Sequence, residues 1–233
     1  MQETARPRAE SARGRGVLEG AFAVLEALRH HGGEAGVTEL ALACGVPKAT
    51  VHRLLEQLIV LDAVERRGQR YRLGARLYRL GQAWQPHPGL REAARLPLHR
   101  LRAATGGSVL LAVLREDRAL TVRAVPGSVE PLVPVRSGAA FSLDTALGKA
   151  LRGPRATGAL LDREQVLAGV CCAALPVRSP GGAVVGALAA MVPAGQPLAT
   201  VARAVAETAT AVTRGLSRGA GGRPVALPPG LLN

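Results

Sequence analysis

The chain has 233 residues, of which 48% are hydrophobic and only 2% aromatic, and its formal net charge is +13 at pH 7. Any core must therefore be aliphatic, and the length suffices for one medium domain or two small ones. The apolar runs are short and interrupted by glycine or proline, and the N-terminus is polar, so the sequence predicts neither a membrane span nor a signal peptide.

The positive charge is spread along the chain. Residues 1–81 hold 13 Lys or Arg and 9 Asp or Glu, and the remainder holds 17 and 8. Basic charge indicates nucleic-acid binding only when it is clustered, so the total alone decides nothing. The three cysteines are an odd number and two are adjacent, which is typical of buried thiols in a reducing compartment and not of a disulfide framework. We expect a cytoplasmic protein.

Residues 1–15 are charged and contain proline and glycine, and we expect them to be a disordered basic tail. Between residues 17 and 31, five apolar residues keep the period of a helix, namely Leu18, Ala21, Phe22, Leu25 and Leu28. A short second helix follows, with Thr38 expected as its N-cap and Gly45 as its C-cap. A third helix is expected from Pro47, a favoured first helical residue, to about Val60.

Residues 63–74 predict a β-hairpin, because apolar and polar residues alternate on both sides of "RRGQR". Three helices followed by a hairpin are the order of a winged helix-turn-helix. Residues 75–84 continue as a helix, and "QPHPG" at 85–89 ends it and marks a domain boundary.

The second half of the sequence predicts several strands in addition to helices. Residues 90–104 predict a helix, and "SVLLAVL" and "ALTVRAV" predict two strands joined by a hairpin turn. "PLVPVRSG" (131–138) predicts a third extended stretch, and "DTALGKAL" a short helix that starts near Asp144 or Thr145. "GVCCAALPV" and "AVVGALAAMV" predict two buried strands, and residues 197–216 a closing helix.

The chain resembles the IclR family of bacterial transcriptional regulators. The resemblance is carried by "VLEGAFAVLEAL", "TELALACGVPKATVHRLLEQL" and "YRLGARLYRLG" in the first half, and in pieces by "TALGKAL" and "GVCCAALPV…AVVGAL" in the second. It implies an α+β protein with an N-terminal winged helix-turn-helix, a linker helix, and a C-terminal GAF-like α/β sandwich with an antiparallel sheet. The expected divisions are a disordered tail (1–15), the winged helix-turn-helix (16–74), the linker helix and break (75–88), the GAF-like domain (89–218) and a loose tail (219–233).

The helix that opens on "GVPKATVHRLLEQL" has two faces. Val51, Leu54, Leu55 and Leu58 share the face expected to pack inward, and the resemblance places the other face in the DNA major groove. The expected DNA contacts are Lys48, Ala49, Thr50, His52 and Arg53 on this helix, and Arg66, Arg67 and Arg70 on the hairpin. Of these, Arg53 is the expected base reader, because a guanidinium can pair with guanine O6 and N7. An ordinary solvated helix face would show the same spacing.

The linker and the second domain carry the remaining expected sites. Leu77, Leu80 and Trp84 are expected in a dimer interface, with packing inside the subunit as the alternative. The resemblance implies an effector site formed by Leu132, Ala146, Leu147, Asp162, Cys172, Ala189 and Met191. Such pockets tend to take a small organic acid or an aromatic compound, and an acid would sit badly against Asp162 unless backbone N–H groups at the start of "TALGKAL" received it.

Three departures from the family concern this effector site. The segment between "TALGKAL" and Asp162 is shortened, Leu143 stands where a histidine is usual, and Ala189 and Met191 stand where serines are usual. They predict a less polar pocket that is smaller or open. Plain core packing for Cys171 and Cys172, and a helix N-cap role for Asp162, are the alternatives.

Catalysis is not expected. All five histidines lie at or before His99, so the second domain lacks a Ser–His or Cys–His pair after that point, and its adjacent cysteines are not at metal-ligand spacing. The leading hypothesis is a dimeric repressor, or dimer of dimers, that binds a pseudo-palindromic operator in double-stranded DNA and responds to a small organic effector, without a cofactor or metal. A regulator that has lost its effector, and an enzyme or ligand carrier with a vestigial helix-turn-helix, are the alternatives.

Overall fold

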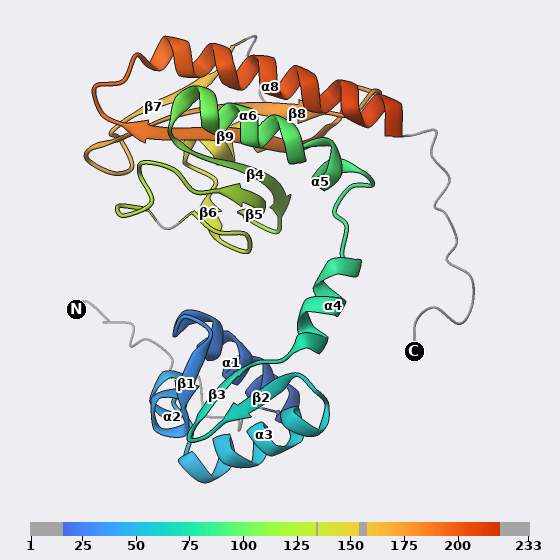
Figure 1. Ribbon diagram of the computed structural model, residues 1–233, viewed down its shortest axis with the longest axis vertical. Coiled ribbons are helices and arrows are strands. Elements are labelled where there is room, and N and C mark those ends of the chain that lie inside the picture. Colours follow the sequence, from blue (N-terminus) through green and yellow to red (C-terminus); the bar gives the residue numbers. More distant parts are fainter. Residues whose placement is uncertain (1–15, 134, 154–157, 220–233) are drawn as a thin grey trace, which may run out of the picture. The chain divides into compact units, whose positions relative to one another are not determined.

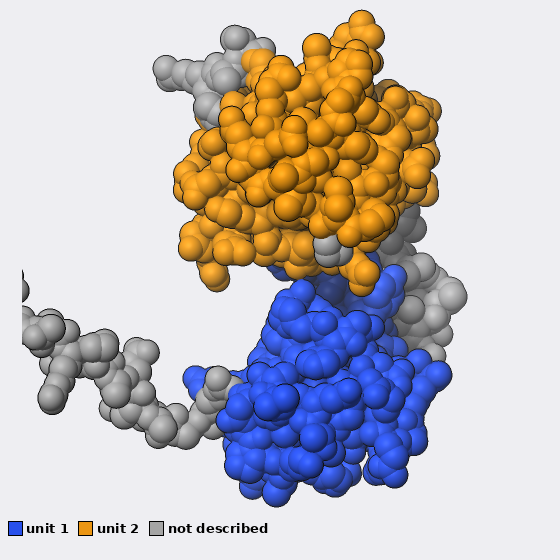
Figure 2. Space-filling model, turned by 90° about the vertical axis from the view of Figure 1, so that its left-hand side faces the viewer, with its two compact units in different colours: residues 1–84 blue, residues 85–233 orange. Residues whose placement is uncertain are grey.

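The computed structural model describes residues 16–133, 135–153 and 158–219 (Figure 1). The chain divides into two compact units, residues 1–84 and residues 85–233 (Figure 2). The tails expected at 1–15 and beyond residue 219 lie outside the described residues. Within the described part of the chain, no helix is both long and apolar enough to span a bilayer.

Unit 1 is a winged helix-turn-helix. Its elements are α1 (Val17–His30), β1 (Glu34–Gly36), α2 (Val37–Cys44), α3 (Lys48–Val60), β2 (Val64–Arg67), β3 (Arg70–Leu73) and α4 (Ala75–Ala83). The predicted hairpin pairs antiparallel, and β1 adds a third strand in the order β1-β3-β2. Strand β1 was not predicted, because three residues are too few to show an alternating pattern.

The core of unit 1 is aliphatic, as the composition requires. Val24, Leu28, Leu40 and Leu55 from the three helices are fully buried, and the hairpin contributes Tyr71. The apolar residues that give α1 its helical period are not all buried. Leu18 and Phe22 are 76% and 67% exposed, whereas Gly20 and Val24 are buried. Helices α1 and α3 approach closely at Gly20, because a Cβ on this residue would lie only 3.1 Å from Leu54 Cδ1.

The predicted starts of two helices shift by one or two residues. Gly36, not Thr38, is the N-cap of α2, and its N–H donates to Glu39 Oε2 at 2.7 Å. Pro47 is the N-cap of α3 and not its first residue. Gly45 has the predicted left-handed conformation at the C-cap, with φ of 64°.

Unit 2 is built on one six-stranded antiparallel sheet. Its strands are β4 (Ser108–Arg115), β5 (Arg118–Val125), β6 (Ala140–Ser142), β7 (Leu160–Arg163), β8 (Val170–Arg178) and β9 (Val184–Pro193), in the order β6-β5-β4-β9-β8-β7. Its helices are α5 (Leu90–Ala93), α6 (Arg95–Thr105), α7 (Ala146–Leu151) and α8 (Leu198–Gly219). The predicted helix 90–104 is therefore interrupted at Ala94.

The two faces of this sheet support two separate cores. Helices α5, α6 and α8 cover one face (Figure 1), where Leu111 and Leu188 are fully buried. On the other face, Leu110 and Ala189 pack with α7. Alternation along β4 and β9 thus sends successive side chains to different layers.

Three further expectations for unit 2 need correction. Residues 131–138 form no strand among those described, and the edge strand β6 comes later, at Ala140–Ser142. Strand β7 was not predicted. No helix follows Asp162, which lies in β7, so its expected helix-capping role is wrong; its Oδ1 instead accepts the Gln165 N–H at 2.9 Å across a short turn.

Candidate functional site

Helix α3 has the two faces that its sequence predicts. Val51, Leu54, Leu55 and Leu58 are buried against the rest of unit 1. The opposite face carries the expected DNA contacts: Lys48, Ala49, His52 and Arg53 are exposed and Thr50 is half-buried. The burial of α3 therefore leaves an amphipathic helix with a polar face toward solvent.

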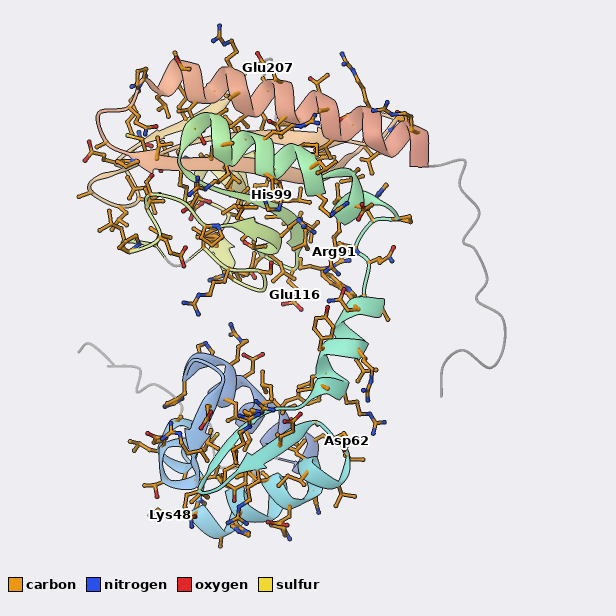
Figure 3. The ribbon with its side chains drawn as sticks, viewed as in Figure 1. Lys48, Asp62, Arg91, His99, Glu116 and Glu207 are labelled. Carbon is orange, nitrogen blue, oxygen red and sulfur yellow. The ribbon has the colours of Figure 1, made fainter. Side chains whose placement is uncertain are left out.

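The N-terminal half of that face is positively charged. Figure 3 shows Lys48 at the N-terminal end of α3, on the outside of unit 1. Neither Lys48 nor Arg53 forms an ion pair with another described residue, whereas His52 Nε2 lies 3.8 Å from Glu56 Oε1. No side chain caps α3, so N–H groups of its first turn remain open to an anion.

The three expected arginines of the hairpin are all exposed. Arg66 bends back, with Nε donating to Gly68 O at 2.9 Å and the guanidinium carbon 5.8 Å from the centre of the Tyr71 ring. Arg67 is exposed beside the turn, which Gly68 makes with φ of 58°. Arg67 can reach phosphate or a groove edge as it stands, whereas Arg66 would first have to leave Gly68 O and the Tyr71 ring.

Arg70 differs from the other two because it bridges three elements. Its Nε lies 3.3 Å from Glu34 Oε1, and its Nη2 lies 3.4 Å from Glu39 Oε2 and donates to Glu34 O at 3.1 Å. The Gly36 N–H, and then Arg70, lower the pKa of Glu39. The charge of Arg70 is thus largely offset, and its geometry fits a residue that holds the hairpin against β1 and α2. The sequence could not show this, because Glu34 and Arg70 are 36 residues apart.

The linker helix α4 contains no buried residue. Leu80 is 61% exposed and Trp84 is 41% exposed. Leu77 is half-buried and packs against the core of unit 1. The three expected interface residues therefore differ: Leu77 packs inside unit 1, whereas Leu80 and Trp84 are exposed, and their place in a dimer interface stays a prediction.

A cavity lies in unit 2 between α7, the sheet and the loop after β7. Its volume is about 80 Å³. It is lined by Leu110, Val133, Phe141, Thr145, Ala146, Leu147, Asp162, Val166, Leu167, Val170, Cys172, Ala189 and Met191. Six of the seven expected effector residues are therefore brought together. The exception is Leu132, which is 58% exposed, and the neighbouring Val133 lines the cavity in its place.

The lining has few polar groups. Thr145 caps α7, accepting the Gly148 N–H at 3.1 Å and donating to Ser142 O at 2.8 Å. Asp162 is 6% exposed and pairs across β7 and β8 with Cys172. Burial raises the pKa of the Cys172 thiol to about 12, and the charge of Asp162 adds to the rise. Cys172 therefore stays a neutral thiol at physiological pH.

The two adjacent cysteines face opposite layers, as expected for a strand. Cys171 is buried in the core under α8, so the plain-core alternative holds for it. Cys172 lines the cavity. Several apolar lining residues were not predicted from the sequence, among them Phe141 in the three-residue strand β6 and Val166 and Leu167 in the loop after β7, because these segments show no periodic pattern.

The described residues contain no cluster of three or more His, Cys, Asp or Glu side chains that could hold a metal ion. The cavity lining offers no histidine, and its cysteine is held neutral. The titratable side chains of the lining are Asp162 and Cys172.

Comparison with known proteins agrees with both units. Residues 17–68 match the IclR helix-turn-helix domain. The glycerol operon regulatory protein of Streptomyces griseus is 28% identical over 87% of this chain and 96% of its own length. The HTH-type transcriptional regulator KdgR of Dickeya chrysanthemi is 30% identical over 62% of this chain and 46% of its own.

Two solved structures show the same fold. One is an IclR homolog of Microbacterium hydrocarbonoxydans in complex with 4-hydroxybenzoate, with a TM-score of 0.75 at 19% identity over 87% of this chain and all of that one. The other is the IclR of Thermotoga maritima, with a TM-score of 0.65 at 20% identity over 85% and 98% of the two chains.

A winged helix-turn-helix with an exposed basic recognition face, joined to an α+β domain with an enclosed cavity, defines a DNA-binding transcriptional regulator. Residues 17–68 match the IclR helix-turn-helix domain, and the chain as a whole is similar to IclR-type transcriptional regulators.

Proposed function

We propose that this regulator is a repressor that binds a pseudo-palindromic operator as a dimer or a dimer of dimers. The observation that carries the proposal is the outward face of α3, where Lys48 and Arg53 are exposed and unpaired among the described residues. Lys48 and the open first turn of α3 would bind a phosphate, and Arg53 would read a base in the major groove. As a protein that acts on DNA, it would work in the cytoplasm.

A palindromic operator follows from a two-fold symmetric dimer. Leu80 and Trp84 on α4 supply exposed apolar area, and Leu18 and Phe22 on α1 supply more. Large apolar side chains grouped on a surface favour association with another subunit. The proposed interface therefore extends beyond the linker residues that the sequence indicated.

The proposed effector site is the cavity beside α7. Its lining is mostly apolar with a small number of polar groups, which is the make-up of small-molecule sites in general. An effector that preferred one of two arrangements of the protein would shift the DNA-binding population. The bound 4-hydroxybenzoate of the Microbacterium protein supports a small molecule in this domain.

One observation favours a second candidate, a regulator that reads DNA without an effector. The cavity volume of about 80 Å³ is below the roughly 150 Å³ of a cavity that takes benzene. The absence of any ligand effect on operator binding would select this second candidate.

The proposal is tested by selecting genomic DNA fragments that the protein retains and deriving their shared motif. We expect an inverted repeat, with half-sites about one helical turn apart, to be enriched. Arg53→Ala should weaken that enrichment and relax the motif at one position of each half-site. Retention of fragments without any common motif would contradict sequence-specific regulation.

A further inference from the structure

The cavity beside α7 has an unusual charge balance. Among the described residues that line it, one side chain is an acid, Asp162, and none is a lysine, arginine or histidine. Asp162 is 6% exposed, and its side chain makes one hydrogen bond to a described residue, from the Gln165 N–H to Oδ1. A buried carboxylate is costly unless its oxygens are hydrogen-bonded or paired.

The remaining polar groups of the lining do not offset this charge. The Thr145 hydroxyl already donates to Ser142 O, and the Cys172 thiol is a weak donor. Ala189 and Met191 lie on β9, on the far side of β8 from Asp162, and bring no hydrogen-bond donor in their side chains. The Asp162 carboxylate is therefore the strongest hydrogen-bond acceptor among the side chains that line the cavity.

From these contacts we propose that the cavity binds a small, mostly apolar hydrogen-bond donor without negative charge, an alcohol or an amine, that donates to Asp162. The inference rests on the proposed effector role of the cavity and names the ligand class. A carboxylate ligand would meet Asp162 with like charge in an apolar, poorly hydrated space, where repulsion is screened little. A donor would instead form a charge-assisted hydrogen bond.

The volume limits the size of the ligand. At about 80 Å³ the cavity is about half the size of one that holds benzene, so an aromatic acid would require the lining to move. Branched compounds of about five heavy atoms are the appropriate probes. Isobutanol, isobutylamine and isobutyrate share one skeleton and differ in charge and donor, and isopropyl methyl ether is an isomer of isobutanol without the hydroxyl proton.

The chain provides its own reporter of binding. It contains two methionines, Met1 and Met191, and Met191 lines the cavity. In the full chain labelled with ¹³C at the methionine methyl groups, the Met191 resonance reports occupancy and the Met1 resonance serves as an internal control. Titration of each probe yields a dissociation constant for this one site.

We expect isobutanol or isobutylamine to bind at least about tenfold more tightly than isopropyl methyl ether and isobutyrate, because a hydrogen bond to a charged group is worth that factor or more. Asp162→Asn should reduce this preference and improve isobutyrate binding. Asp144→Asn, which removes a carboxylate that is 89% exposed near the start of α7, should change neither.

Equal or tighter binding of isobutyrate or of the ether would overturn the proposed ligand class, as would an unchanged preference in Asp162→Asn or no Met191 shift with any probe. The operator affinity is measured in parallel with and without the probe. Binding to the cavity without a change in operator affinity would leave the ligand class standing and reject the effector role. A change in operator affinity with isobutyrate would support the effector role and reject the proposed ligand class.

Discussion

Arg53 and Arg67 are the side chains on which the DNA-binding account depends most directly, because both are exposed and neither is held by a described partner. We expect Arg53→Ala to weaken operator binding by about 1–3 kcal/mol and to relax sequence preference, since it removes a bidentate base contact. Fluorescence anisotropy with the operator and with single-base variants measures both effects. Arg29→Ala is the matched control, since Arg29 on α1 is occupied by Glu26 at 2.8 Å.

Arg70 should behave differently from Arg67. We expect Arg70→Ala to lower the stability of unit 1, because it releases Glu34 and Glu39 together, whereas Arg67→Ala should lower DNA affinity and leave stability unchanged. Both ion pairs, Arg70–Glu34 and Arg70–Glu39, are half-exposed, so the loss of stability should be small but measurable. Urea denaturation and DNA binding of both variants separate the roles, and equal stability of the two variants would reject the bridging role of Arg70.

Cys172 gives a prediction for alkaline pH. Its folded-state pKa is raised from 9.0 to about 12, so above pH 9 the unfolded chain loses this proton and the folded chain keeps it. The contribution of this thiol to stability is therefore present below pH 9 and is lost between pH 9 and 12. We expect Cys172→Ala to reduce the slope of unfolding free energy against pH between 9 and 11 by up to one proton. An identical slope in wild type and variant would contradict the assigned environment of Cys172.

At the scale of elements, two glycines in helices should respond in opposite ways to alanine. A Cβ on Gly148 in α7 would overlap the backbone of Leu143, whereas a Cβ on Gly81 in α4 meets nothing within 4 Å. We expect Gly148→Ala to destabilise unit 2 by about 3 kcal/mol or more and to disturb the cavity. Gly81→Ala should stabilise by about 0.5–1 kcal/mol, as is usual within an open helix. If thermal unfolding showed Gly148→Ala to be neutral, the close packing of α7 against the backbone of Leu143 would be contradicted.

The linker helix α4 supplies the test of assembly. We expect Leu80→Glu to weaken the dimer in sedimentation equilibrium, because it places a charge in the proposed apolar interface. Leu77→Ala should instead reduce the stability of unit 1, by about 1–2 kcal/mol for a half-buried leucine, with little effect on association. A monomeric wild-type protein at micromolar concentration would exclude the dimer.

Long periodic elements could be predicted from the sequence, and short or irregular ones could not. Helix α3 and strands β8 and β9 are long, and the hairpin has a turn signal at Gly68 between its two short strands, so the predicted positions are confirmed. Strands β1 and β7 have three and four residues, and their pairing depends on distant partners. Leu18 and Phe22 are exposed although they belong to an apolar stripe of α1. The sequence pattern reveals such a stripe but does not say whether residues of the same chain or of a second chain cover it.

The candidate sites follow the same division. The face of α3 could be predicted because a regular helix fixes which residues share a side. The effector positions came from the family resemblance, and six of them line the cavity. The strand register brings three of these together, Asp162, Cys172 and Met191. The offset charge of Arg70 and the loop residues that close the cavity depend on tertiary contacts that no local pattern encodes.

At the scale of the whole molecule, the proposed function requires that operator binding and effector binding be coupled. If an effector lowers operator affinity by some factor, linkage requires that the operator lower effector affinity by the same factor. Couplings of this kind are typically about 1–3 kcal/mol. Titrating the ligand with and without saturating operator, through the Met191 resonance, measures that factor independently.

The central claim is sequence-specific DNA binding through α3, and the most direct measurement is a gel shift with the DNA upstream of the protein's own coding region. The experiment titrates salt and unrelated competitor DNA for the wild type and for Arg53→Ala. The account predicts a discrete complex that survives competitor, weakens as salt rises because phosphate contacts release counterions, and is lost to competitor in the variant. Binding that competitor abolishes equally in both proteins, with the same result for fragments chosen from the whole genome, would contradict it.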